Sequence, residues 1–240
     1  MSLQAMCNTH LMPYNLPTMI EVIPSVYQLK NSFVNLYLIV EPEGLTLIDS
    51  GIRRSGPQLV LETIAKLGRQ PSDLKRILIT HSDGDHTGGA KELKAATGAT
   101  IYVSPNDGEK MAQGLAGREA SGPLGWLAGS MTKRMAPLSP QKPDVLLSDG
   151  QELPVLGGLW VVFTPGHTPG HVSYFSPSRK ILFAGDSFNT TGGKIKWLRG
   201  PFTWNFEAGK QSIALQSKLG AEVVCCGHGD PMRGPLEFPF

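Results

Sequence analysis

The sequence has few cysteines, which limits the disulfide bonds that it could form. Its 240 residues include three, and two of these, Cys225 and Cys226, are adjacent. Neighbouring cysteines rarely pair, so a disulfide framework is excluded and a reducing compartment, the cytoplasm, is the expected location. Cys225 and Cys226 lie just before His228. We nevertheless interpret them as small buried strand residues rather than metal ligands, because free cysteine is among the most buried residue types.

The sequence also lacks an excess of charge and any long apolar run. The formal net charge of +2 gives no broad basic surface, so we expect no nucleic-acid partner. No signal peptide is evident, and no stretch offers the roughly eighteen uninterrupted apolar residues that a membrane span needs. A hydrophobic content of 40% suits a single domain over residues 1–240. We expect a small-molecule substrate and no membrane partner, and the sequence does not indicate an oligomeric state.

The chain does contain a dense set of potential metal ligands. Residues 77–89, ILITHSDGDHTGG, place His81, Asp83, Asp85 and His86 directly after an apolar run. That run predicts a strand buried on both faces, and open α/β sheets bind ligands beyond the carboxyl ends of such strands. Imidazole together with carboxylate suits Zn, Mn or Fe better than Ca. Taken alone, the segment is also compatible with an ordinary polar turn.

Further potential ligands follow other β-like runs. Of six histidines, five lie in three glycine-containing turns, and a fourth run ends in an acid, Asp186. The turns hold His81 and His86, His167 and His171 (TPGHTPGH), and His228 (CCGHGDP). Strands that each end in a potential ligand predict one convergent site.

The order of these motifs resembles the signature of a known family. HSDGDH, an HxDxDH variant of HxHxDH, is followed by GHTPGH, GD and GHGD. Together they resemble the metallo-β-lactamase superfamily of binuclear metallohydrolases, which includes glyoxalase II thioesterases, lactonases, β-lactamases and ribonuclease Z. The resemblance runs from about Asn35 to Pro231. It implies an α/β fold, a four-layer αββα sandwich of two mixed β-sheets with outer helices. The strand pattern alone supports only a mixed α/β sheet.

Carried over by position, the resemblance divides seven predicted ligands between two divalent ions. The first ion would be held by His81, Asp83 and His167. The second would be held by Asp85, His86 and His228. Asp186 would bridge the two ions. The resemblance also implies that Asp49, in LTLIDSG, supports the ligands from behind, and that His171 lies beside the site rather than on a metal.

Asp83 departs from the family pattern, which has histidine there. A carboxylate makes the cluster less positive, so bound water is harder to deprotonate. It is also a harder ligand than imidazole, which moves preference from Zn toward Mn or Fe. We therefore expect two divalent ions, with Zn as the family's usual metal and Mn or Fe as alternatives.

The function that follows is a metal-dependent hydrolase. It would cleave an ester, thioester, lactone or amide by attack of a metal-bridged hydroxide that Asp85 orients. Two alternatives stay open. One is an iron-dependent oxidoreductase on the same fold, because Asp83 also resembles the diiron pattern of flavodiiron proteins. The other is a metal-poor binding module, since fold does not fix function.

Apolar periodicity predicts the remaining strands and helices of the chain. Residues 111–143 are irregular and form either a lid insertion or a packed helical hairpin. Trp126 within them, together with Lys194 and Trp197 after Asp186, are possible substrate contacts. Expected strands cover 20–29, 34–40, 45–48, 100–103, 145–147, 159–163, 172–175 and 181–183, and expected helices 58–67, 90–96 and 206–219.

Overall fold

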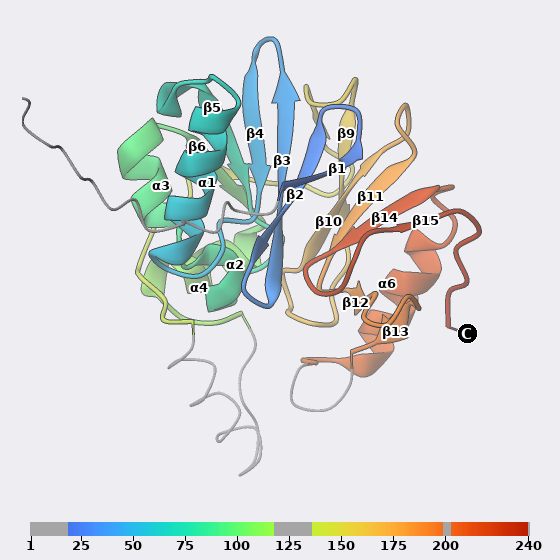
Figure 1. Ribbon diagram of the computed structural model, residues 1–240. Helices are drawn as coiled ribbons and strands as arrows, with labels where there is room; N and C mark the ends of the chain where they lie inside the picture. The colour runs from blue at the N-terminus through green and yellow to red at the C-terminus, as the bar shows by residue number, and fades with distance from the viewer. Residues whose placement is uncertain (1–18, 118–135, 199–202, 240) are drawn as a thin grey trace, which may run out of the picture.

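The structure is a computed structural model that describes residues 19–117, 136–198 and 203–239 (Figure 1). Trp126 and most of the predicted lid insertion, 111–143, lie outside these ranges, so both stay predictions. None of the described helices is long and apolar enough to cross a bilayer.

The first sheet has seven strands in chain order, because each successive strand adds beside the last. Neighbours from β1 to β4 pair antiparallel, whereas β4 to β7 pair parallel through helical crossovers. The strands are β1 (Met19–Ile23), β2 (Val26–Asn31), β3 (Val34–Glu41), β4 (Gly44–Ile48), β5 (Leu74–Leu78), β6 (Thr100–Val103) and β7 (Val145–Leu146).

The second sheet has six strands in the order β15-β14-β11-β10-β9-β8. Only β11 and β14 pair parallel, and helix α6 (Phe206–Gln216) lies between them in sequence. A separate small hairpin, β12 (Phe188–Asn189) with β13 (Lys196–Trp197), follows β11. The strands of the second sheet are β8 (Glu152–Leu153), β9 (Leu159–Phe163), β10 (Val172–Ser176), β11 (Ile181–Gly185), β14 (Val223–Cys226) and β15 (Met232–Arg233).

Three apolar clusters hold the layers together. One lies between the sheets and joins residues such as Tyr37 and Leu78 to Tyr174 and Phe183. A second packs the first sheet against its helices, and a third packs the second sheet against α6. Figure 1 shows helices on both outer sides, which confirms the predicted αββα sandwich of two mixed sheets. The helices on the first sheet are α1 (Ser55–Lys66), α2 (Gly84–Thr87), α3 (Ala90–Thr97) and α4 (Pro105–Gln113), with a 3-10 turn, η1, over Pro71–Asp73.

Most predicted elements are confirmed to within a few residues, but the single strand over 20–29 is wrong. The structure divides it into β1 and β2, which pair antiparallel around a turn at Pro24 and Ser25. Pro24 lacks an N–H for a sheet ladder, and Ser25 has a φ of 72°, so the extended run cannot continue. The interpretation of Cys225 and Cys226 as buried strand residues is confirmed, since both lie in β14 and neither is accessible.

Two residues that flank the undescribed range 118–135 pack on the loop after β5. A Cβ added at Gly84 would lie 2.0 Å from the Ala136 carbonyl oxygen, and one added at Gly117 would lie 2.8 Å from Ser82 Oγ. Gly117 and Ala136 therefore lie beside the segment that carries four predicted ligands.

Candidate metal centre

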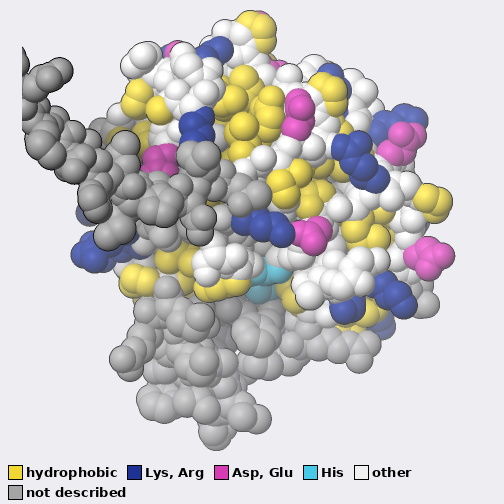
Figure 2. Space-filling model, in the orientation of Figure 1, with side chains coloured by type: hydrophobic (Ala, Val, Ile, Leu, Met, Phe, Trp, Pro, Cys, Tyr) yellow, Lys and Arg dark blue, Asp and Glu magenta, His cyan; other side chains and the backbone are white. Residues whose placement is uncertain are grey.

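The predicted ligands converge where strands of both sheets end. The loop after β5 carries His81 to His86, and the loop between β9 and β10 carries His167. Asp186 directly follows β11, and His228 follows β14. Both sheets thus deliver side chains to one edge of the sandwich. Figure 2 shows only a small area of histidine surface on one face, consistent with the burial of most of these side chains.

The residues predicted for the first ion lie together and are all buried. His81, Asp83 and His167 each offer an atom within 4.8 Å of the others. Asp83 Oδ2 lies 3.2 Å from His167 Nε2 and 3.8 Å from His81 Nε2. The carboxylate at position 83 therefore reaches both imidazoles despite being shorter than histidine.

The residues predicted for the second ion form a more open group. Asp85, His86 and His228 also offer atoms within 4.8 Å of one another. Asp85 Oδ2 lies 3.7 Å from His86 Nε2 and 3.5 Å from His228 Nε2. The His228 side chain is 26% exposed, whereas His86 is fully buried.

Asp186 lies between the two groups. Its Oδ2 is 3.7 Å from His167 Nε2 in the first group and 3.2 Å from His228 Nε2 in the second. Its Oδ1 is 3.5 Å from His86 Nε2. One carboxylate thus faces imidazoles of both groups, the arrangement that a bridging ligand needs.

Three buried polar atoms at the centre have no hydrogen-bond partner among the described residues. They are His81 Nε2, His86 Nε2 and Asp186 Oδ1, and together they form a third group of potential ligand atoms. Buried polar atoms are normally paired, so unpaired ones that face each other need a reason. Nitrogen and carboxylate donors at this spacing fit divalent transition metals.

Hydrogen bonds behind the site turn the Nε2 atoms of His81 and His86 inward. His86 Nδ1 lies 2.8 Å from Asp49 Oδ2, and His81 Nδ1 lies 3.0 Å from Thr80 Oγ1. The Thr80 hydroxyl in turn donates to Asp49. Both Nδ1 atoms therefore carry a proton, so Nε2 is the nitrogen of each ring that is available to a metal ion. Asp49, which has a φ of 60° and is 2% exposed, organises both rings.

His228 is oriented by the turn between β2 and β3. Its Nδ1 donates to the Phe33 carbonyl oxygen at 2.8 Å, so its Nε2 faces Asp186 and Asp85. The Phe33 ring stacks on the His228 ring, with 6.0 Å between the ring centroids, and is 45% exposed. Phe33 is therefore an exposed apolar surface beside the open group, and the sequence analysis does not single it out.

His171 lies beside the site, and its hydrogen bonds keep it neutral. Its Nε2 accepts from the Asp186 N–H at 3.0 Å, while Nδ1 lies 2.8 Å from Thr164 Oγ1. Burial and the neighbouring His167 lower the pKa of His171 to about 3. His171 belongs to none of the three groups of potential ligands and holds the backbone of Asp186 in place.

The protein without ions compensates its carboxylates with protons. Burial disfavours the charged form of His86, but Asp49 and Asp186 outweigh it and raise the pKa of His86 to about 9. Burial would also lower the pKa of His228, but Asp186 and Asp85 outweigh it and raise that pKa to about 11. Burial would raise the pKa of Asp186, yet His228 and His86 hold it well below its usual range. The site therefore favours bound cations.

The sequence analysis missed Asn35, which fixes the loop that carries His228. Its side chain donates to the Cys226 and Gly229 carbonyl oxygens, and its N–H donates to the Gly227 carbonyl oxygen at 2.8 Å. Asn35 lies on β3 of the first sheet and the loop follows β14 of the second. The contact spans most of the chain, so no local pattern in the sequence indicates it.

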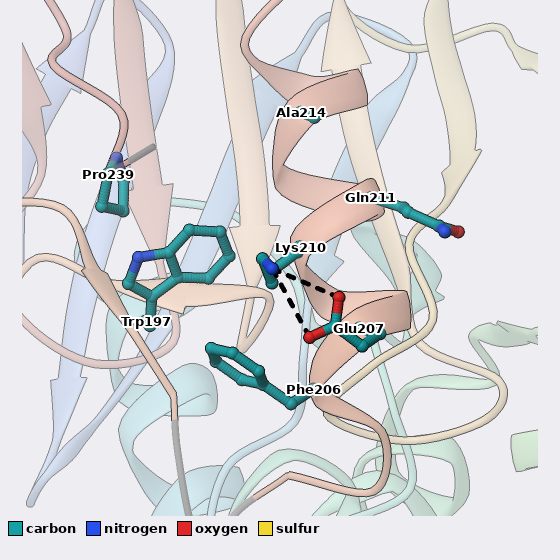
Figure 3. A pocket seen from close by; sticks show the side chains of 7 residues that line it. All are labelled: Trp197, Phe206, Glu207, Lys210, Gln211, Ala214 and Pro239. Carbon is teal, nitrogen blue, oxygen red and sulfur yellow. Dashed lines mark hydrogen bonds and ion pairs between the residues drawn. The ribbon is translucent and has the colours of Figure 1, made fainter.

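Two of the predicted substrate contacts, Lys194 and Trp197, lie on the small hairpin that follows Asp186. Lys194 is exposed on the turn between β12 and β13. Trp197 lines a surface pocket of about 620 Å³ against α6, with its ring 5.6 Å from that of Phe206 (Figure 3). By contrast, the backbone N–H of Trp204 donates to the His167 carbonyl oxygen, and its side chain is 48% exposed. Trp204 is thus a second exposed aromatic residue whose backbone adjoins a predicted ligand, on the segment after Asp186 that also carries Lys194 and Trp197.

Comparison with known proteins places this geometry in context. A model of the metallo-beta-lactamase superfamily matches residues 29–228. A probable metallo-hydrolase, YflN, from Bacillus subtilis (strain 168) is 30% identical over 89% of this chain and 87% of its own length. A hydroxyacylglutathione hydrolase from Cereibacter sphaeroides (strain ATCC 17029) is 32% identical over 65% of this chain, but the match covers only 48% of that enzyme.

Solved structures agree with the sequence comparison. A metallo-beta-lactamase from Cronobacter sakazakii, a mutant of a HARLDQ motif, superposes with a TM-score of 0.69 at 27% identity. The superposition covers 88% of this chain and 79% of the other. With its fold, its His and Asp clusters and these relatives, the chain belongs to the metallo-β-lactamase superfamily.

Proposed function

We propose that the protein is a binuclear metallohydrolase that cleaves an acyl bond, with thioesters as the first class to test. The observation that carries this proposal is the pair of ligand groups that share Asp186. His81, Asp83 and His167 would hold one divalent ion, and Asp85, His86 and His228 the other. When bound, such ions polarise a substrate carbonyl and lower the pKa of water. The relatives named hydroxyacylglutathione hydrolase, a thioesterase activity, support the choice of substrate class.

The residues of this chain supply orientation and charge. Burial would raise the pKa of Asp85, but His86 and His228 lower it, so Asp85 is a carboxylate at neutral pH. It is 7% exposed, and we infer that it accepts a hydrogen bond from the attacking water while also serving as a ligand. Asp49 and the Phe33 carbonyl fix the rings of His86 and His228, so the donor set is preorganised.

The exposed rings of Phe33 and Trp204 are proposed as the walls of the substrate site. The Phe33 ring stacks on His228, and the Trp204 backbone N–H donates to the His167 carbonyl oxygen, so one aromatic residue adjoins each ligand group. Aromatic walls with a few polar groups are typical of sites for small molecules with apolar parts. We therefore expect an acyl or ring portion of the substrate to contact them.

Elemental analysis of protein purified without added metal tests the proposal, followed by a screen of thioesters, esters, lactones and amides. About two Zn, Mn or Fe ions per chain with hydrolysis of one class would support it. Iron accompanied by oxygen consumption would instead favour the oxidoreductase. Protein that binds no metal and hydrolyses nothing would contradict the proposal and favour a binding module.

A further inference from the structure

A buried carboxylate outside the proposed ligand set joins the two loops that carry the first ligand group. Asp107 lies in α4 and is 1% exposed. Its Oδ2 accepts from the Ser82 N–H at 2.8 Å and from Thr168 Oγ1 at 2.9 Å, and its Oδ1 accepts from the Gly170 N–H at 2.9 Å. Ser82 lies between two predicted ligands, and Thr168 follows another. Asp107 therefore connects loops that belong to different sheets.

Burial of this carboxylate is costly, so its hydrogen bonds have a specific role. Burial raises the pKa of Asp107, and Asp83 adds to the rise, while the donors Ser82 and Thr168 oppose it. If this carboxylate only filled space, an apolar side chain of similar size would give a more stable protein. Both oxygens of Asp107 instead receive donors from the ligand loops, which ties its burial to the position of those loops.

Glycine backbones close tightly around the same carboxylate. A Cβ added at Gly170 would lie 2.4 Å from Asp107 Oδ1, and one added at Gly117 would lie 2.8 Å from Oδ2. Ser104, the residue before α4, also donates through its hydroxyl to the Gly170 carbonyl oxygen. Side chains larger than hydrogen at these two glycines would push the carboxylate away from its donors. The junction that Asp107 forms with Ser82, Thr168 and Gly170 thus has little freedom to shift.

The junction controls one distance in the site. Asp83 Oδ2 and His167 Nε2, which lie on the two joined loops, are 3.2 Å apart. The strand ends are already linked, because the Val172 N–H donates to the Thr80 carbonyl oxygen. That bond joins the strand ends, whereas Asp107 joins the loops that follow and precede them, through Ser82 and Thr168. Since aspartate has a shorter reach than histidine, a ligand group with Asp83 tolerates less separation of the loops.

We propose that Asp107 is a positioning residue that holds the ligand group of His81, Asp83 and His167 together and leaves the other group unaffected. This inference rests on the proposed binuclear site. It predicts an effect confined to one of the two ions, because the contacts of Asp107 lie on loop positions next to Asp83 and His167. The ring of His228, in the other group, is held by Phe33 instead.

The test is Asp107→Asn in the full chain, with Zn and Mn binding measured by chelator competition on metal-free protein. An amide has one acceptor oxygen, so in either orientation its NH₂ opposes a backbone N–H of Ser82 or Gly170. Loss of such support weakens metal binding by about 10- to 100-fold. We expect this loss for one ion and unchanged affinity for the other.

Asp144→Asn is the matched control. Asp144 also accepts from a backbone N–H, that of Ile101 at 2.9 Å, and pairs with Lys94, and both of these partners lie outside the ligand loops. We expect both ions to bind this variant as in the unaltered protein. A loss equal to that of Asp107→Asn would overturn the inference, because any buried or partly buried carboxylate would then give the same result.

Combining Asp107→Asn with a second substitution shows which of the two ions is bound more weakly. In His228→Ala, which removes a ligand of the second group, Asp107→Asn should still weaken the remaining ion. In His167→Ala, which removes a ligand of the first group, it should have no further effect. The reverse pattern, or equal weakening in both backgrounds, would overturn the inference.

A milder variant keeps the test decisive if Asp107→Asn does not fold, as judged by circular dichroism. Thr168→Val removes one donor to Asp107 and should weaken the same ion to a smaller extent. If the unaltered protein binds two ions and both variants match it, the inference fails alone. If two ions bind selectively as predicted but no substrate is cleaved, the proposed function fails and the inference stands. If the unaltered protein binds no ion, both are overturned.

Discussion

The two ligand groups differ in how they are enclosed. His81, Asp83 and His167 are all buried, and the loops around them are joined by hydrogen bonds through Asp107. In the second group His228 is 26% exposed and lies beside the exposed ring of Phe33. One group is thus closed by the fold, whereas the other opens toward the surface. We infer that substrate approaches on the side of His228.

The largest expected effect comes from the residue that the two groups share. Asp186→Ala removes the carboxylate that faces imidazoles of both groups, so both ions should bind poorly and kcat/KM should fall by about a thousandfold or more. Metal content and hydrolysis rate are the measurements. Asp230→Ala is the control, because that carboxylate is exposed and pairs only with Lys30 in the described contacts. Two ions retained in Asp186→Ala would contradict the bridging role.

The next largest effect is expected for Asp49, which reaches ligands of both groups, directly or through Thr80, whereas Asp107 contacts the loops of one. Asp49→Asn places an amide opposite His86 Nδ1 and weakens the link through Thr80 to His81. Since these rings belong to different groups, the affinity for both ions should fall by about 10- to 100-fold, unlike the selective loss expected for Asp107→Asn. Chelator competition measures both. Asp73→Asn serves as the control, because Asp73 ends the 3-10 turn η1 before β5, whereas the ligand loop follows the other end of that strand. Loss of only one ion would show that Asp49 acts on one group.

Metal affinity should fall as pH falls. The raised pKa values of His86, about 9, and His228, about 11, mean that both rings are protonated near neutral pH without ions. Binding must displace these protons, so the affinity should drop by up to about a hundredfold per pH unit lost between pH 8 and 6. The same shifts stabilise the metal-free fold below the unfolded pKa of histidine, about 6.5, and this contribution is lost as pH rises through the folded values.

Calorimetric titration in two buffers of different ionisation enthalpy measures the released protons. Release of about two protons as both ions bind is the expected result. Binding without proton release at pH 7 would contradict the charge state assigned to His86 and His228. Because His86 and His228 both belong to the second group, we expect that group to account for most of the release.

The smallest expected effect is on KM, from the exposed aromatic residues beside the ligand groups. Phe33→Ala removes the exposed ring and keeps the backbone carbonyl that holds His228, so kcat should change little while KM for apolar substrates rises by about 3- to 30-fold. Trp204→Ala should act in the same direction. Trp160→Ala is the matched control, because its ring is 43% exposed but packs on Phe175 of β10. An equal effect of all three variants, or none, would contradict the proposed substrate walls.

The composition of the site was predictable because its chemistry is concentrated in short motifs. Potential ligands follow β-like runs, and strands that end at one edge bring such residues together. The roles of Asp49 and His171 came instead from the family resemblance, and in the structure Asp49 contacts His86 while His171 accepts from the Asp186 N–H. By contrast, Trp197 was expected near substrate only because it follows Asp186 in sequence. In the structure its ring lies 5.6 Å from that of Phe206 of α6, and its contact with substrate stays a prediction.

The residues that fix the ligand loops were not predictable, because their contacts span large separations in sequence. Asn35 reaches Cys226 and Gly229, and Asp107 reaches Gly170. In the sequence Asp107 has only the appearance of a helix-start residue after Ser104 and Pro105. The division of β1 from β2 was missed for a local reason, since Ser25 adopts a positive φ that apolar periodicity does not reveal.

The sequence by itself determined the mixed α/β class, the potential donor residues of the site and their order along the chain. Periodicity and residue chemistry are local properties, and these features depend on them. The tertiary structure alone decided which carboxylate faces both groups, which nitrogen of each imidazole points inward and which group is exposed. These depend on hydrogen bonds and packing between the two sheets, where residues as distant as Phe33 and His228 meet.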